Sequence, residues 1–392
     1  MRNHLTIAAL ACSLAFPTAA HSEDIVVGFA IAKSGWLEAY DKPATTAAKI
    51  RIDEINKAGG LLGKQIKIVE ADTKTDREQG AKAGLEVLDA GAAMMVVSCD
   101  YDLGAPAALT AESAGKNSFF LCAEDIKAGI QGVGPNSFSP SVLAAVQGAT
   151  MAEWANSKRG AKSAYVLLDT AIEYNKGVCK GFDWMWAELP GTKLLGSDTF
   201  KNNDASIASQ ITRIKSLSEK PDVVMLCSFI PGAASAVRQL RAAGIDSLIV
   251  NGSAVDGSYW LGSVPNLSNF VVPVLASIYG DDPRQDVRNF NEKYKADAGS
   301  YPSSTYAYPG YLLIDLWAKA VERVGTTDTA AVTAELEKMR DEPTIFGNWT
   351  FSSELHQQNT GLMQIIEVND GKPARIDEWT ISKPVPLDVL LK

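Results

Sequence analysis

Short apolar runs alternate with stretches of helical spacing from residue 25 onward, and few folds accommodate such a rhythm. Residues 25–31 form a mostly β-branched apolar run, which indicates a buried strand. After Pro43 the apolar residues recur at helical spacing as far as Ile55, and residues 66–69 indicate a second strand. A strand, a helix and a strand in this order form a βαβ unit, which predicts a parallel sheet with a right-handed crossover.

The same rhythm fills two stretches of the chain. In the first stretch, strand-like runs at 92–97 and 118–122 alternate with helix-like runs, and we expect one of these helices at 106–114, opened by Pro106. A segment rich in Gly, Pro and Ser at 129–140 interrupts the rhythm. The rhythm restarts with strand-like runs at 164–168 and 222–227, and we expect a helix at 177–189 between them. With 392 residues the chain is long enough for more than one core. The sequence therefore predicts an α/β protein built from two doubly wound lobes.

The last part of the chain has a different pattern. Helix-like runs at 287–298, 307–324 and 328–339 come first. The segments 361–368 and 376–381 then alternate like antiparallel strands, and Asn369-Asp370-Gly371 between them is a hairpin signal. We expect a strand hairpin close to the C-terminus.

The first 22 residues differ from the rest and predict an exported protein. Arg2 gives a basic start, residues 5–16 form an apolar core, and small residues suit cleavage near Ala20 or Ser22. The residues before Cys12 faintly resemble a lipoprotein box, and lipidation stays open. The net charge of −9 argues against nucleic acid or an anionic membrane as a partner. Without an evident oligomerisation motif, we expect a monomer.

Four cysteines follow the predicted leader, and an exported protein can keep them as disulfides. Cys99 and Cys122 each end a strand-like run, so adjacent parallel strands could bring them within bonding distance. A Cys99–Cys122 bond and two buried free thiols are the open alternatives, and the same choice holds for Cys179 and Cys227. The cysteine spacings indicate no metal site, and we expect no cofactor.

Catalytic motifs are scarce, which favours a binding protein over an enzyme. His356 is the one histidine beyond the predicted leader, so histidine-based acid–base catalysis, Ser-His-Asp triads and histidine-ligated zinc are not expected. The glycines at 59–63 before Lys64 lack the spacing of a phosphate loop, and they follow a helix instead of preceding one. No G-x-S-x-G segment occurs.

Aromatic and polar side chains follow the predicted strand ends in both stretches. Parallel strands end at one edge of a sheet, and two such edges facing each other form a cleft that suits a ligand. The alternative is that the acids cap the helices that follow them. The candidates are Trp36, Tyr40, Asp100, Tyr101, Asp102, Glu124 and Asp125 in the first stretch, and Tyr174, Phe229, Ser253 and Asp256 in the second.

Three segments near the N-terminus resemble a known family. Residues 28–35, the Asn-Lys-Ala-Gly-Gly run within 53–64, and 70–72 with Asp76 look like the branched-chain amino-acid type of periplasmic binding protein. These proteins are the solute receptors of ABC importers, and they have the two-domain type I fold. The resemblance extends over essentially the whole mature chain and is strongest at 25–125.

The resemblance implies two α/β lobes with a ligand cleft between them, joined by three interdomain crossings. The first lobe would comprise 24–140 plus 277–350, and the second 141–276 plus 351–392. The implied protein is periplasmic, closes on a small molecule by a hinge motion and delivers it to the membrane permease of an ABC importer. The implied ligand loops begin at Ser34 and Ala123 and after Ser98 in the first lobe, and Tyr174, Phe229 and Ser253 close over the ligand from the second.

The chain departs from the amino-acid receptors at the implied site. The resemblance implies a small hydroxyl-bearing segment at the positions where this chain has Asp100, Tyr101 and Asp102, a bulkier and acidic run. It also implies a threonine near the position of Asp125. Ser253 replaces the usual glutamate, with Asp256 nearby. Acids beside aromatics suit an amino-acid-like or amine-bearing ligand.

Two other readings of the resemblance stay open. An aromatic carboxylate would also suit the aromatic residues, with Lys33 or backbone amides as its donors. A receptor of this type can also serve as the ligand-sensing subunit of a membrane receptor, and the sequence does not separate that role from transport.

Overall fold

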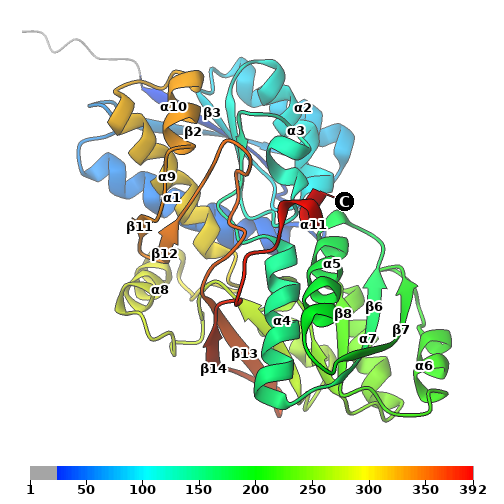
Figure 1. Ribbon diagram of the computed structural model, residues 1–392. Coiled ribbons are helices and arrows are strands. Elements are labelled where there is room, and N and C mark those ends of the chain that lie inside the picture. The colour runs from blue at the N-terminus through cyan, green and yellow to red at the C-terminus, as the bar shows by residue number, and fades with distance from the viewer. Residues whose placement is uncertain (1–23, 392) are drawn as a thin grey trace, which may run out of the picture.

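Two separate sheets organise the chain in a computed structural model that describes residues 24–391 (Figure 1). The predicted leader and its cleavage sites lie outside these residues. The first sheet has five parallel strands in the order β2-β1-β3-β4-β5, and the βαβ unit predicted at its start is present. Its strands are β1 (Ile25–Ile31), β2 (Ile66–Asp72), β3 (Met94–Val97), β4 (Asn117–Phe120) and β5 (Ser137–Phe138).

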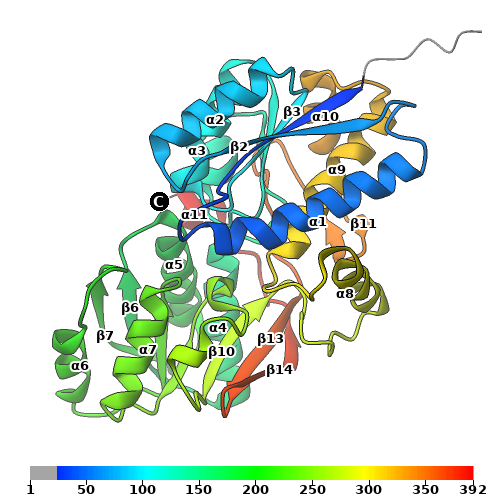
Figure 2. The ribbon, with the colours of Figure 1, turned by 180° about the vertical axis from the view of Figure 1, so that it is seen from behind.

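Helices from two distant parts of the sequence cover the first sheet. Those that alternate with its strands are α1 (Glu38–Lys57), α2 (Arg77–Asp89) and α3 (Tyr101–Ser113), and the later ones are α8 (Gln285–Ala298), α9 (Ala307–Val324) and α10 (Thr329–Leu336). Helix α9 packs along α1 (Figure 2). Arg51 of α1 pairs with Asp315 of α9 at 3.0 Å. A small hairpin, β11 (Glu342–Thr344) and β12 (Gly347–Trp349), completes this lobe.

The second sheet has seven strands in the order β14-β13-β10-β9-β8-β6-β7. Its strands are β6 (Ser163–Asp169), β7 (Lys193–Phe200), β8 (Val223–Cys227), β9 (Leu248–Val250), β10 (Phe270–Val274), β13 (Met363–Asn369) and β14 (Lys372–Trp379). Its helices are α4 (Ala144–Arg159), α5 (Glu173–Glu188), α6 (Ala208–Lys215), α7 (Gly232–Ala242) and the terminal α11 (Leu387–Leu391). The hairpin expected near the C-terminus is β13–β14, which turns at Asp370 and Gly371 with φ values of 51° and 70°.

The chain passes between the two sheets three times, as the type I fold requires. The passages lie between β5 and α4, between β10 and α8, and between β12 and β13. The first and third passages run side by side: the Ser139 N–H donates to the His356 carbonyl at 3.1 Å, and the Leu143 N–H donates to the Gln358 carbonyl at 2.9 Å. The His356 ring stacks on Phe138 with centroids 3.7 Å apart. Within residues 24–391 no helix has the length and apolarity needed to cross a membrane.

Two helices begin earlier than the sequence indicated, and both starts lie beside the cleft. Helix α3 was expected from residue 106 but begins at Tyr101, because the Asp100 carboxylate caps it by accepting the Leu103 N–H at 3.1 Å. Pro106 is accommodated inside the helix. Helix α5 was expected from residue 177 but begins at Glu173. Residues that had been placed in loops are therefore first-turn helical residues.

Helices α4 and α5 approach each other closely enough to require glycine at their contact. A Cβ atom on Gly181 would lie 1.8 Å from the Ala145 carbonyl oxygen, and one on Gly148 would lie 1.9 Å from the Val178 carbonyl oxygen. Because both obstacles are backbone atoms of a neighbouring helix, a side chain at either position would push the helices apart. This contact fixes α5, whose first turn carries Tyr174.

Gly181→Ala should lower the free energy of unfolding by about 1–3 kcal/mol, because the added methyl group overpacks the α4–α5 contact. Gly262→Ala is the matched control, since a Cβ atom there would meet nothing within 4 Å. Equilibrium urea unfolding of both variants measures the difference. Equal stability of the two variants would contradict the packing described for α4 and α5.

Candidate functional site

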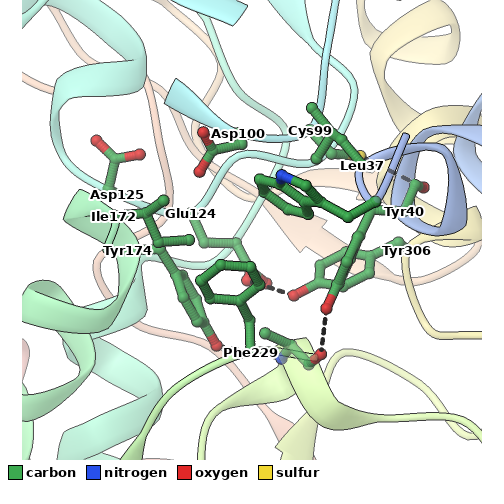
Figure 3. A pocket seen from close by; sticks show the side chains of 12 residues that line it. Leu37, Tyr40, Cys99, Asp100, Glu124, Asp125, Ile172, Tyr174, Phe229 and Tyr306 are labelled. Atoms are coloured by element: carbon green, nitrogen blue, oxygen red, sulfur yellow. Dashed lines mark hydrogen bonds between the residues drawn. The ribbon is translucent and has the colours of Figure 1, made fainter. Parts of the chain in front are cut away.

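A pocket lies between the two lobes, at the carboxyl ends of both sets of parallel strands (Figure 3). The free volume inside it is only about 30 Å³, so side chains of the two lobes nearly fill the space between them. Its walls are made by Trp36, Leu37, Tyr40, Cys99, Asp100, Glu124, Asp125, Ile172, Tyr174, Phe229, Ala254 and Tyr306. Aromatic rings and carboxyl groups make up most of this lining.

A disulfide joins two of the loops that form the pocket. Cys99 follows β3 and Cys122 follows β4, and they are bonded to each other. Asp100 comes directly after the first cysteine, and Glu124 comes two residues after the second. The bond therefore ties together the two loops that carry the acids. A second disulfide, Cys179–Cys227, joins α5 to the end of β8 in the other lobe.

Side chains of the first lobe reach across the pocket to the second. The Tyr40 hydroxyl donates to the Ala254 carbonyl at 3.1 Å and accepts the Ile230 N–H at 3.1 Å. The Trp36 ring lies against Phe229 with centroids 4.8 Å apart. Trp36 is 36% exposed and so stands at the mouth, whereas Tyr40 and Phe229 are buried. The lobes are therefore in contact around the pocket.

Three buried carboxyl groups face this pocket, and none of its lining residues is a lysine, arginine or histidine. Burial removes water from the charged form, which raises the pKa of Glu124 to about 8 and of Asp125 to about 7. Burial also raises the pKa of Asp100 well above its usual range, and the neighbouring Asp102 and Asp125 add to this rise. The pocket thus holds acids that lack a positive counter-charge.

Glu124 is bonded to hydroxyl groups from both lobes. The Tyr306 hydroxyl lies 3.0 Å from Oε2 of Glu124 (Figure 3). The Ser253 Oγ lies 2.9 Å from each carboxyl oxygen of Glu124. Ser253 is held in place by Gln147, whose Oε1 accepts the Ser253 N–H at 2.9 Å and the Tyr174 hydroxyl at 3.0 Å. This network links the lobes beneath the pocket.

Most of the site residues predicted from the sequence gather at this pocket. Those that line it are Trp36, Tyr40, Asp100, Glu124, Asp125, Tyr174 and Phe229. Ser253 lies directly behind the lining, bonded to Glu124. Asp256 lies further away, where it accepts the Tyr279 hydroxyl and the Thr305 N–H, each at 2.8 Å. Ala123 is buried, and its carbonyl accepts the Gln357 amide at 3.2 Å.

Three other predicted residues do not line the pocket. The Ser34 hydroxyl donates to Asp72 at 3.3 Å. The Tyr101 hydroxyl donates to the Gly132 carbonyl at 3.4 Å. Asp102 accepts the Glu173 N–H at 2.9 Å, so it bridges the two lobes outside the lining. Because α3 begins at Tyr101, Tyr101 and Asp102 lie in its first turn and project from the helix surface.

Sequence reasoning missed Tyr306, Leu37, Ile172 and Ala254 as lining residues. Tyr306 immediately precedes α9, about fifty residues after the last strand-end candidate, and no strand end marks its position. The other three are apolar neighbours of predicted candidates, and a search for polar side chains passes over them. Among residues 24–391, no group of histidine, cysteine, aspartate and glutamate side chains could hold a metal ion.

Comparison with known proteins agrees with this architecture. The sequence model of a family described as periplasmic binding protein matches residues 24–373. The "Leu/Ile/Val-binding protein BraC3" of Rhizobium johnstonii is 24% identical over 354 residues, which cover 88% of this chain and 91% of that protein. The "Amino acid binding protein" of Pseudomonas aeruginosa is 24% identical over 361 residues, or 87% and 90% of the two chains.

Solved structures give the same fold. The branched-chain amino acid transporter substrate binding protein LivJ of Streptococcus pneumoniae, in complex with isoleucine, has a TM-score of 0.79 at 24% identity and covers 91% of this chain and 99% of its own. A solute binding protein of an ABC transporter from Rhodopseudomonas palustris, in complex with 3,4-dihydroxybenzoic acid, has a TM-score of 0.74 at 19% identity, with 92% and 98% covered.

The stability of the empty protein should fall as the pH rises from about 6.5 to about 8, because a carboxyl group in an unfolded chain has a pKa of about 4. With pKa values of about 8 for Glu124 and about 7 for Asp125, the folded protein binds more protons than the unfolded chain in this range. Each such proton contributes a slope of about 1.4 kcal/mol per pH unit. Urea unfolding across this range measures it, and a free energy of unfolding that rises with pH would contradict the burial of these acids.

Proposed function

Since the chain belongs to the periplasmic binding protein family, we propose that it is a periplasmic receptor for a small organic cation and delivers this ligand to an ABC permease. The observation that carries this proposal is the lining of the pocket. Three buried carboxyl groups, from Asp100, Glu124 and Asp125, stand among aromatic rings in a lining that contains no basic residue. An ammonium group would supply the missing positive charge.

Aromatic rings support the same ligand class. Tyr40, Tyr174, Phe229, Tyr306 and Trp36 line the pocket, and a cation within about 6 Å of a ring face is attracted to it. The attraction strengthens where water is excluded, and all of these rings except Trp36 are buried. Carboxyl groups and ring faces together favour an amine or a quaternary ammonium ion.

A ligand carboxylate finds few donors in the pocket. Lys33, which the sequence offered as one, is bonded to Glu70 at 3.0 Å. Two backbone N–H groups beside the pocket are already taken by the protein's own acids: Asp100 accepts the Leu103 N–H, and Asp125 accepts the Lys127 N–H at 2.9 Å. This argues for an amine-bearing ligand over an aromatic carboxylate. An amino acid would have to bind chiefly through its ammonium group.

The proposed mechanism is hinge closure of two lobes, 24–140 plus 277–350 and 141–276 plus 351–392. A ligand between Glu124 and Phe229 would contact both lobes, and its differential affinity would shift the population to the closed state. The protein is proposed to bind as a monomer and to release its ligand unchanged. Docking on a membrane receptor instead of a permease is the sensing alternative, and it uses the same closed form.

A thermal-shift panel tests the ligand class, on protein that has been unfolded and refolded to remove any retained ligand. The panel contains choline, putrescine, leucine and benzoate. A ligand at one hundred times its dissociation constant adds about 2.7 kcal/mol of stability, enough to move the unfolding midpoint by several degrees. We expect a shift with the amines. A shift with benzoate alone would overturn the cation proposal and leave the aromatic rings as the main contacts.

Phe229→Ala should weaken binding of the responding amine by about 1 kcal/mol or more, roughly fivefold, because it removes a buried ring of the pocket. Tyr101→Ala is the matched control: Tyr101 also follows a strand end, but it does not line the pocket. Isothermal titration calorimetry measures both dissociation constants. If the Tyr101 variant lost more affinity than the Phe229 variant, the ligand would lie elsewhere.

A further inference from the structure

Glu124, Ser253 and Tyr306 form a closed ring of hydrogen-bonding groups beneath the pocket. The Ser253 Oγ is 2.9 Å from the Glu124 carboxyl oxygens, the Tyr306 hydroxyl is 3.0 Å from Oε2, and the two hydroxyl oxygens are 3.0 Å apart. Every pair of the three groups is therefore within hydrogen-bond distance. All three residues are at most 8% exposed.

Counting hydrogens in this ring indicates the protonation state of Glu124. Each hydrogen bond needs one hydrogen between its two oxygens, and a hydroxyl group supplies only one. If Glu124 is a carboxylate, the two hydroxyl groups supply two hydrogens for the three pairs of groups. If Glu124 is a carboxylic acid, its own proton completes the ring: Glu124 donates to Ser253, Ser253 to Tyr306, and Tyr306 back to Glu124.

The partners of the other pocket acids are of a different kind. Asp100 and Asp125 accept backbone N–H groups, which donate and cannot accept, so these bonds favour the carboxylate. Hydroxyl groups can reverse their direction, so the bonds of Glu124 can be kept in either protonation state. Among the pocket acids, Glu124 is thus the one whose surroundings suit a change of charge.

The charged groups around Glu124 form no ion pair with it among residues 24–391. Within the pocket it faces Asp125 and the tyrosine hydroxyls of Tyr40, Tyr174 and Tyr306, and the Gln147 amide opposes the rise in its pKa. A neighbouring cavity on its other side is lined by Lys127, Lys176, Lys180 and Glu173. Lys127 and Lys176 are both paired with Glu173, at 2.9 and 2.6 Å. Within residues 24–391, Glu124 has no ion pair.

We propose that Glu124 holds a proton in the empty closed pocket and releases it to solvent when a cationic ligand binds. The proton and the ligand are then alternative counter-charges for one carboxylate. In the exchange, the O–H bond of Glu124 breaks, the proton passes to buffer, and the ligand's positive charge remains beside the carboxylate, so the net charge of the site is conserved. This inference rests on the proposed function, because it requires a cation as the ligand.

Proton exchange makes binding pH-dependent. Below the pKa of Glu124, each cation bound releases about one proton, and the apparent affinity rises up to about tenfold for each pH unit gained. Ligand capture would therefore weaken in an acidified periplasm. A pocket whose acids were already ionised would show no such dependence.

Calorimetry with choline tests the exchange. A quaternary ammonium ion has no N–H proton, so any proton that appears comes from the protein. Titration at pH about 7 in phosphate and in Tris, whose ionisation enthalpies differ, gives the number of protons released. We expect about one proton per choline for the wild type and a loss of about one proton in Glu124→Gln. An unchanged proton count in this variant would overturn the proposal.

Asp183→Asn is the matched control for charge, because Asp183 is an exposed acid on α5 outside the pocket lining. This variant should release as many protons as the wild type. Glu124→Gln should fold, because a glutamine amide resembles a protonated carboxyl group in shape and can both donate and accept.

A measurement without ligand separates this proposal from the proposed function. Between pH about 7 and about 8.5, the stability of wild-type empty protein should fall more steeply than that of Glu124→Gln, by a slope equivalent to about one proton. Asp183→Asn should keep the wild-type slope. Equal slopes for wild type and Glu124→Gln would show that Glu124 holds no proton, whatever ligand the receptor binds. If the slopes differ but choline fails to bind, the proton is supported and the cation proposal fails.

Discussion

Parallel pairing of β1, β3 and β4 decides where every functional side chain of the first lobe can lie. Because these strands run in one direction, the loops that follow them meet at a single edge of the sheet. The second sheet pairs β6, β8 and β9 in the same way. Three passages of the chain hold the two edges face to face, so residues as distant as Tyr40 and Ala254 come within hydrogen-bond distance.

Buried carboxyl groups determine which ligand charge the pocket favours. Relatives named for leucine, isoleucine and valine share the fold with this chain at about a quarter identity, and a structural neighbour was solved with an aromatic acid. The scaffold alone therefore does not determine the ligand. In this chain Asp100 and Asp125 occupy backbone donors that a ligand carboxylate could otherwise use, and the same carboxyl groups make the pocket attractive to positive charge.

The sequence predicted the two sheets, the hairpin at Asp370 and most of the lining, because strand periodicity and strand ends are local signals. It did not predict Tyr306, which reaches the pocket from the start of a helix in the returning segment. It also placed Tyr101 and Asp102 in a loop, since Pro106 resembled a helix start, whereas the Asp100 cap starts the helix five residues earlier. The return of Tyr306 depends on tertiary contacts, and the Asp100 cap is a local side-chain contact to the Leu103 N–H. Residue periodicity records neither.

The Cys99–Cys122 bond makes the shape of the site depend on the redox conditions around the chain. Disulfides persist outside the cytosol and are kept reduced within it. In a newly made chain that has not been exported, the loops before Asp100 and Glu124 would be joined only through their strands, and the acids would be less firmly held together. For the periplasmic receptor proposed above, the finished pocket would thus form in the compartment where the ligand arrives.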